Sequence, residues 1–218
     1  AESANGAATE NDVTVTGGTV TTATGGESTH GEASGNTAVI SGGTVTNVYG
    51  GKAGTLSKGN KIFLKDSATA TNLTGGEGAS SEGDDSAVVE GGTVSTGGIV
   101  VGGKSTAGNV VKANVHLKGG TVNGTVYGAD SAADATGNGV AVTGGTVNAG
   151  IYGAKAAGTA ERNWARLDTA VTGDITGALS TGGNASSNTV EVNADVTGSI
   201  VGGNAAAGNA SGNKIVLQ

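Results

Sequence analysis

The side chains that most often support catalysis or metal binding are few in this sequence and lie far apart. Histidine occurs twice, as His30 and His116, and cysteine is absent. A zinc site needs several such ligands that converge on one point. We therefore interpret both histidines as solvated surface residues, with His30 in a loop and His116 on the outward side of a strand. The sequence predicts no metal and no cofactor.

The densest group of carboxylates forms an acidic loop. Ca²⁺ takes roughly six or more oxygen ligands from a shaped loop. Neither the EF-hand pattern nor the G-G-x-G-x-D repeat of calcium-binding rolls occurs here. We interpret the loop as solvated; its members are Glu77, Glu82, Asp84 and Asp85.

Lys65, Glu90 and Lys118 occupy one outward position in three successive repeat units, with alternating sign. The alignment predicts a surface ion-pair ladder, in which each pair typically contributes less than ~1 kcal/mol. A polysaccharide-cleaving β-helix enzyme would need carboxylates or a basic residue clustered in a groove. No column collects two carboxylates, because Asp168 lies two units beyond Lys118. We expect no enzymatic activity.

Aromatic residues are the best candidates for binding. Trp164 stands between Arg162 and Arg166 in the most highly charged part of the chain, and Phe63 takes an outward position on an equivalent strand. Such residues stack on sugar rings or anchor a protein partner, although isolated surface aromatics are also common. These four residues are the predicted binding residues. The three tyrosines are expected on another strand, at Tyr49, Tyr127 and Tyr152.

A repeat of about 25 residues must position all of these side chains. In residues 36–51 a short alternating run leads to a Gly-Gly corner, then to Thr-Val-Thr, an apolar pair and a second Gly-Gly. The spacing of two between apolar residues predicts a half-buried strand with paired inward residues. These pairs are Val13/Val15, Ala38/Ile40, Ile62/Leu64, Ala87/Val89, Val115/Leu117, Val140/Val142, Ala165/Leu167, Val190/Val192 and Ile215/Leu217.

Two positions before each inward pair lies a recurrent asparagine. Stacked Asn amides bond to one another, and Asn tolerates the left-handed conformation of a corner. We expect a structural ladder of Asn11, Asn36, Asn60, Asn138, Asn163, Asn188 and Asn213. Asp85 and Ala113 fall in the same column and are separated by the one long repeat. We place the extra residues of that repeat near residues 108–112, where Asn109 would take the Asn role.

Two further short strands complete each unit. The last of them is predicted at Val48-Tyr49 in one early unit and at Leu179-Ser180 in a late one. Gly-Gly corners supply the positive φ of tight bends. The fold predicted is all-β: a parallel β-solenoid (β-helix) of eight to nine turns, right-handed and three-sided, roughly 40 Å long. Residues 1–218 form one repetitive segment, which we interpret as part of a longer rod because neither end carries a polar cap.

Composition supports this fold and restricts the partners. With 44 Gly, no Pro and no three-residue period, the chain is neither collagen nor a compact globule with a large core. The net charge of −7 argues against nucleic acid and anionic membranes as partners. No apolar run approaches the ~18 residues of a membrane span.

The chain resembles the passenger repeats of bacterial autotransporter adhesins, the surface rods of the type V secretion pathway. The resemblance rests on the Gly-Gly-Thr-Val corner, on Val48 to Gly51, and on the Gly-Asn restarts such as Gly35-Asn36 and Gly59-Asn60. It implies an extracellular rod on a bacterial cell surface, with no functional residue to carry over.

The leading expectation is therefore an extracellular structural or adhesive solenoid that binds a host or neighbouring-cell protein or glycan through repeated weak contacts. The alternative is a self-assembling filament joined through uncapped strand edges. A polysaccharide-acting enzyme and an ice-binding module are less favoured. The latter needs a regular Thr-x-Thr array, and that array changes to Ser and Asn after the third unit.

Overall fold

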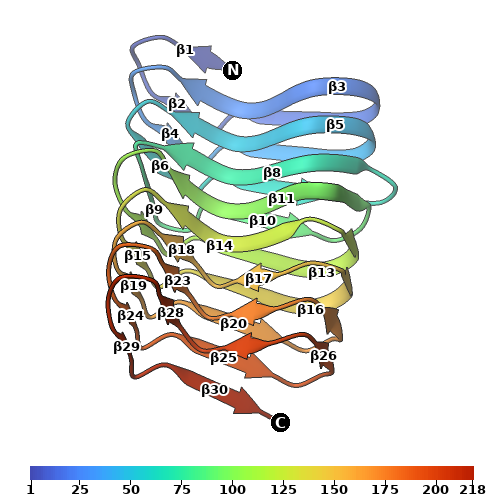
Figure 1. The fold of residues 1–218 in the computed structure, drawn as a ribbon. Helices are drawn as coiled ribbons and strands as arrows, with labels where there is room; N and C mark the ends of the chain where they lie inside the picture. The colour runs from blue at the N-terminus through green and yellow to red at the C-terminus, as the bar shows by residue number, and fades with distance from the viewer.

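The computed structural model describes residues 1–218 and contains strands but no helix. Successive turns stack as a parallel β-solenoid, with the chain ends at opposite ends of the stack (Figure 1). The strands form one 21-stranded and one nine-stranded sheet, and the paired strands are parallel. The nine-stranded sheet takes one strand from each turn, so the predicted all-β solenoid is confirmed with nine turns.

The nine-stranded sheet runs along one edge of the solenoid (Figure 1). Its strands are short because the chain bends directly after each of them. They are β2 (Ala8–Thr9), β4 (Ala33–Ser34), β6 (Leu56–Lys58), β9 (Ser80–Glu82), β12 (Val110–Val111), β15 (Ala135–Thr136), β19 (Ala160–Glu161), β24 (Ala185–Ser186) and β29 (Ala210–Ser211).

The strands that carry the inward pairs follow each bend. They are the first parts of β3 (Asp12–Ser28) and β5 (Thr37–Ala53), then β7 (Lys61–Leu64), β10 (Ser86–Val89), β13 (Asn114–Val122), β16 (Gly139–Val147), β20 (Trp164–Leu167), β25 (Thr189–Val192) and β30 (Lys214–Leu217). Each inward pair aligns with the next: Ile62 and Leu64 pair with Ala87 and Val89, for example. The predicted register of these strands is confirmed in all nine turns.

The return strands bring the chain back across the core. They are β1 (Glu2–Ser3), the second parts of β3 and β5, β8 (Thr69–Gly78), β11 (Thr93–Ser105), β14 (Thr125–Ser131), β17 (Ile151–Tyr152), β18 (Lys155–Ala156), β21 (Val171–Thr172), β22 (Ile175–Thr176), β23 (Leu179–Ser180), β26 (Val196–Thr197), β27 (Ile200–Val201) and β28 (Asn204–Ala205). One assignment was wrong. Ile151 and Ile200 align with Ile175, whereas Leu179 aligns with Lys155 one segment later.

The core is a continuous column of Val, Ile, Leu and Ala that runs through the turns. β-branched residues suit it because they pack well on a pleated surface. Ile40, Ile62 and Leu64 are among the fully buried side chains, and burying one such side chain contributes about 1.5–3 kcal/mol. In the last turn Ile215 and Leu217 are 44% and 67% exposed, since no strand lies on their far side.

A column of glycines in the return strands is required by close backbone packing and not by positive φ. A Cβ placed on Gly128 would lie 2.7 Å from both the amide N and the carbonyl O of Gly139, and would also meet the carbonyl of Gly153. The return strand therefore crosses the start of the inward strand that follows it in the chain, with only hydrogen atoms between the backbones. The same column comprises Gly25, Gly50, Gly75, Gly102, Gly128, Gly153, Gly177 and Gly202.

The bend before each inward strand has a left-handed residue, but this residue is not the asparagine. The residue just before the Asn column takes φ values between 54° and 67° in all nine turns. Gly provides this conformation without strain, whereas Arg162 adopts it at φ 55°. The column is Glu10, Gly35, Gly59, Asp84, Lys112, Gly137, Arg162, Ser187 and Gly212.

The asparagines stack one above another and are joined by hydrogen bonds. Nδ2 of each donates to Oδ1 of the next, at 2.9 Å from Asn11 to Asn36 and 3.0 Å from Asn138 to Asn163. The backbone N–H of each also donates to that Oδ1, as from Asn36 to Asn60 at 3.0 Å. Asn36 and Asn60 are fully buried, so the ladder satisfies polar groups that water cannot reach.

The ladder is interrupted once, at Asp85 and Ala113. Asp85 is the last member of the N-terminal part of the ladder, and its carboxylate accepts a hydrogen bond from Asn60 Nδ2. Ala113 begins the second part, and it takes part only through its backbone N–H, which donates to Asn138 Oδ1 at 2.8 Å. Val110 stands where the other turns have Ala or Ser, and its side chain lies near the smaller Ala113. Asn109 does not take the Asn role, because it accepts a bond from the Asp134 N–H at an exposed position.

The extra residues of the long repeat lie mainly elsewhere than predicted. Val110 and Val111 are in register with Ser81 and Glu82, so residues 108–112 do not hold the whole insertion. Val94 pairs with Val122 and Ile99 with Thr125. Residues 95–98 therefore bulge against the shorter segment 123–124 of the next turn. A bulge at an exposed corner leaves the inward pairs in register.

Asp85 places a carboxylate in the buried ladder. Its Oδ1 accepts bonds from the N–H and Nδ2 of Asn60, at 2.8 and 3.0 Å, and its Oδ2 accepts from Ser81 Oγ at 2.7 Å. Burial raises the pKa of Asp85 above its ordinary value of 3.8, against hydrogen bonds that lower it. Because the folded-state pKa is raised, the stability linked to this group is fully present below the unfolded pKa and is lost as pH rises through the folded pKa.

We expect Asp85→Asn to increase stability at pH 7 by about 1–2 kcal/mol. An amide there repeats the bonding of Asn60, whose Nδ2 donates to Ser57 Oγ and to the Ala33 carbonyl. Urea unfolding of both proteins from pH 7 to about pH 3 measures the difference, which should shrink with acid. Asp12→Asn, at an exposed position, is the control. An equal gain at all pH values would contradict the carboxylate explanation.

Candidate functional site

The structure places the four predicted binding residues on one face but does not bring them together. Phe63 and Arg166 share an outward column and are separated by Val88, His116 and Ala141. That separation is four turns, or roughly 19 Å at the spacing of parallel strands. Trp164 and Arg162 lie beside Arg166, so Phe63 belongs to a different part of the face.

Trp164 packs over a glycine of the preceding turn. Gly139 is its strand partner, and a Cβ on Gly139 would collide with the fused-ring carbons Cδ2 and Cε2 of the indole. The middle of the ring system therefore covers the backbone of Gly139. The equivalent positions in other turns hold polar residues such as Asn114 and Thr189, which leave no such room. Gly139 and Trp164 are a complementary pair.

Each arginine beside Trp164 is bound to a carboxylate. Arg162 Nη1 lies 3.6 Å from Glu161 Oε1, and Arg166 Nε donates to Asp168 Oδ1 at 3.2 Å. The same Oδ1 accepts a bond from Asn193 Nδ2 at 2.7 Å. The hydrogen bond from Asn193, followed by that from Arg166, lowers the pKa of Asp168. Asp168 therefore stays ionised and holds Arg166 in place.

Phe63 lies beside the predicted charge column. Lys65 and Lys118 both bind Glu90, each at 3.3 Å, and Lys65 Nζ also lies 5.2 Å from the centre of the Phe63 ring. The hydrogen bond from Lys65, followed by that from Lys118, lowers the pKa of Glu90. These partly exposed pairs join three turns, and each contributes modestly.

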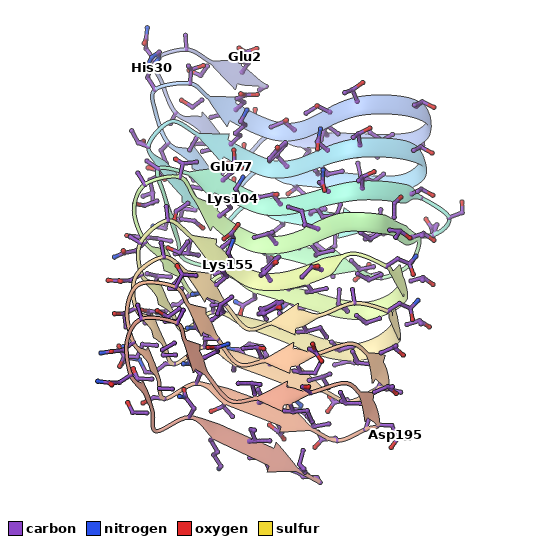
Figure 2. All side chains as sticks on the ribbon, in the orientation of Figure 1. Glu2, His30, Glu77, Lys104, Lys155 and Asp195 are labelled. Carbon is purple, nitrogen blue, oxygen red and sulfur yellow. The ribbon has the colours of Figure 1, made fainter.

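A longer charge column on the return strands was missed by sequence reasoning. Salt bridges join Glu27 to Lys52 at 3.4 Å, Glu77 to Lys104 at 2.8 Å and Asp130 to Lys155 at 3.3 Å. Figure 2 shows Glu77, Lys104 and Lys155 one above another on the near face. The signal was present, because each of these residues follows a Gly-Gly or Gly-Ala pair with alternating sign.

The tyrosines lie beside this charge column, and their rings are occupied. Tyr127 and Tyr152 stack with centroids 5.1 Å apart. Lys155 Nζ lies 5.9 Å from the Tyr127 ring, and Lys52 Nζ lies 5.7 Å from the Tyr49 ring. Burial, followed by the proximity of Tyr152, raises the pKa of Tyr127. The contacts of Tyr127 with Tyr152 and Lys155 join neighbouring turns, whereas Lys52 and Tyr49 belong to the same turn.

The remaining candidates are dispersed. Nδ1 of His30 bonds to the Ala4 carbonyl, whereas His116 is half-buried and its pKa is lowered by burial and then by Lys118. The acidic loop is split between Glu77 in its salt bridge and Asp85 in the ladder. No three His, Cys, Asp or Glu residues converge, and the surface has no pocket.

The threonine column is more regular than the Thr-x-Thr pairs suggested. The first Thr of each pair is in register through six turns, whereas the second position changes to Ser95, Asn123 and Asn148. The register runs through Thr19, Thr44, Thr69, Thr93, Thr121 and Thr146. Only the first position of each pair therefore presents a continuous column of threonine hydroxyls, because the second position does not keep Thr.

Searches against protein-family models, curated proteins and solved structures found no match for this chain. The structure contains no helix that is long and apolar enough to cross a membrane.

Proposed function

We propose that this chain is a structural and adhesive segment of an extracellular rod on a bacterial cell surface. The observation that carries the proposal is the register of the outward side chains. Threonines stack in register through six turns, and the charged residues of the return strands recur in one column with alternating sign. A partner that lies along the rod therefore meets a hydroxyl or a charged group at each ~4.8 Å step of these columns.

Repeated weak contacts suit an adhesive role. Exposed ion pairs and single hydroxyls each contribute little, but linked contacts raise the overall avidity by orders of magnitude. The fold also suits a spacer, because the inward pairs join every turn to the next and the asparagine ladder joins all but one pair of successive turns. Self-association of rods through such columns or through strand edges is the alternative.

The test is a bead assay with purified residues 1–218 coupled at increasing density. We expect retention on cultured epithelial cells to rise more steeply than in proportion to density, as avidity requires. Beads coated with an unrelated acidic protein are the control. Beads that bind only to beads carrying the same chain would support self-association instead. Beads that bind neither surface would contradict both roles.

A further inference from the structure

The indole of Trp164 differs from every other aromatic ring in the chain. The sequence contains one Trp, three Tyr and one Phe. Lysine ammonium groups lie over Tyr49, Phe63 and Tyr127, and Tyr152 stacks on Tyr127. Neither a cation nor a second ring lies against Trp164, although it is the best cation acceptor of the set.

The carboxylates explain why the ring stays uncovered. Arg162 and Arg166 flank Trp164, and either side chain could fold over the indole if no carboxylate bound it. Glu161 binds Arg162, while Asp168 binds Arg166 and is itself held by Asn193. The indole rests on Gly139 and Trp164 is only partly buried, so part of the ring is open to solvent.

We infer that Trp164 is the stacking platform of a binding site for a neutral saccharide. The electron-rich face of an indole attracts the C–H face of a sugar ring. Arg166 lies on the same strand and Asp168 directly follows that strand, so fixed donors and acceptors stand roughly 7 Å from the platform and beyond it. A sugar ring on Trp164 could use both kinds of group through its hydroxyls. The inference names a partner for the adhesive surface and so rests on the proposed function.

Charge favours a neutral sugar over an acidic one. The two arginines are each neutralised by a carboxylate, and Glu191 is the strand partner of Arg166. The chain as a whole carries −7, which repels polyanions. A protein partner fits less well, because protein hot spots lie in well-packed, fully desolvated surroundings. The strand neighbours of Trp164 are Gly139 and Thr189.

The single tryptophan gives a direct assay. Purified residues 1–218 are titrated with maltohexaose, cellohexaose and mannohexaose, and with oligogalacturonate as an anionic comparison, while tryptophan fluorescence is recorded. We expect a saturable change with at least one neutral sugar and a weaker one with oligogalacturonate. No response to any neutral sugar, or a preference for the anionic one, would overturn the inference.

Variants locate the site. Gly139→Ala places a methyl group under the indole and should weaken binding about tenfold or more, as should Trp164→Ala followed by calorimetry. Phe63→Ala is the matched control, because Lys65 already covers that ring. Circular dichroism establishes that each variant is folded. Equal losses in Phe63→Ala and Trp164→Ala would contradict a site at Trp164.

The bead assay separates this inference from the proposed function. If beads carrying Trp164→Ala are retained on cells as well as the unmodified beads, and no sugar binds, adhesion stands and the sugar site is wrong. If sugar binds but neither bead type is retained, the site stands and the adhesive role is wrong.

Discussion

Gly128→Ala is expected to destabilise the solenoid by about 3 kcal/mol or more, since a Cβ at this position has only backbone to collide with. It would lie 2.7 Å from the N and the O of Gly139 and would also meet the carbonyl of Gly153. A flexible side chain could move away, but these are backbone atoms of residues that are hydrogen-bonded to neighbouring turns. The added methyl group must separate adjacent turns.

The measurement is urea unfolding followed by circular dichroism, with hydrogen exchange to locate the effect. Exchange should increase most in β14 and β16, which meet at this contact. Gly17→Ala is the matched control, because a Cβ there meets no atom within 4 Å. We expect the control to change stability by no more than ~0.5 kcal/mol. Similar losses in both variants would show that chain entropy, and not close packing, explains the glycine column.

Asn163→Ala should cost about 2–4 kcal/mol, because it removes one step of a buried ladder. Asn163 is 1% exposed. Its Oδ1 accepts from the N–H and Nδ2 of Asn138, and its Nδ2 donates to the Ala135 carbonyl and to Asn188 Oδ1. The truncation leaves these partners buried without a bond, and an unsatisfied buried group costs more than the net value of one hydrogen bond.

The natural alanine at 113 shows which changes make such a gap tolerable. Asp85 in the turn before it has no amide hydrogen to donate, and Val110 supplies extra volume beside Ala113. Asn163→Ala has neither adjustment, since Asn138 precedes it and Ala160 stands in the place of Val110. The free energy of unfolding lost in Asn163→Ala should therefore exceed the cost of the missing amide at Ala113 in the native protein.

Asn148→Ala is the matched control for the ladder. Asn148 Nδ2 donates to Asn123 Oδ1 at 2.9 Å in the same turn-to-turn manner, but at an exposed position. Water replaces that bond, so its loss should stay within ~0.5 kcal/mol. Urea midpoints of both variants give the comparison. A loss for Asn163→Ala no larger than that for Asn148→Ala would falsify a stabilising role for the buried ladder.

Local periodicity was sufficient to predict the inward strands and the asparagine column. Apolar residues spaced by two, such as Ile62 and Leu64, mark one face of a strand whatever its neighbours are. Their recurrence with a nearly constant period aligns one turn with the next. The register of every inward pair and the position of Asn36, Asn60 and Asn163 therefore follow from the sequence.

The register of the strands that follow a loop could not be predicted in the same way. A loop absorbs extra residues without moving the strands that flank it, so counting from one landmark fails beyond it. This is why the extra residues near 95–98 were placed near residues 108–112, and why Leu179 was assigned to the strand that Ile175 forms. The position of the insertion and the strand partner of Leu179 are determined by the pairing of adjacent turns and not by the number of residues between them.

The sequence by itself determined the repeat, the inward face and the class of fold, because these depend on side-chain alternation within a few residues. The tertiary structure alone decided which charges meet, why Gly128 is glycine and which aromatic ring is left open. Glu77 meets Lys104 across a turn of the solenoid, and Trp164 rests on Gly139 of the previous turn. Such contacts depend on distances between turns and on side-chain rotamers, which no spacing along the chain specifies.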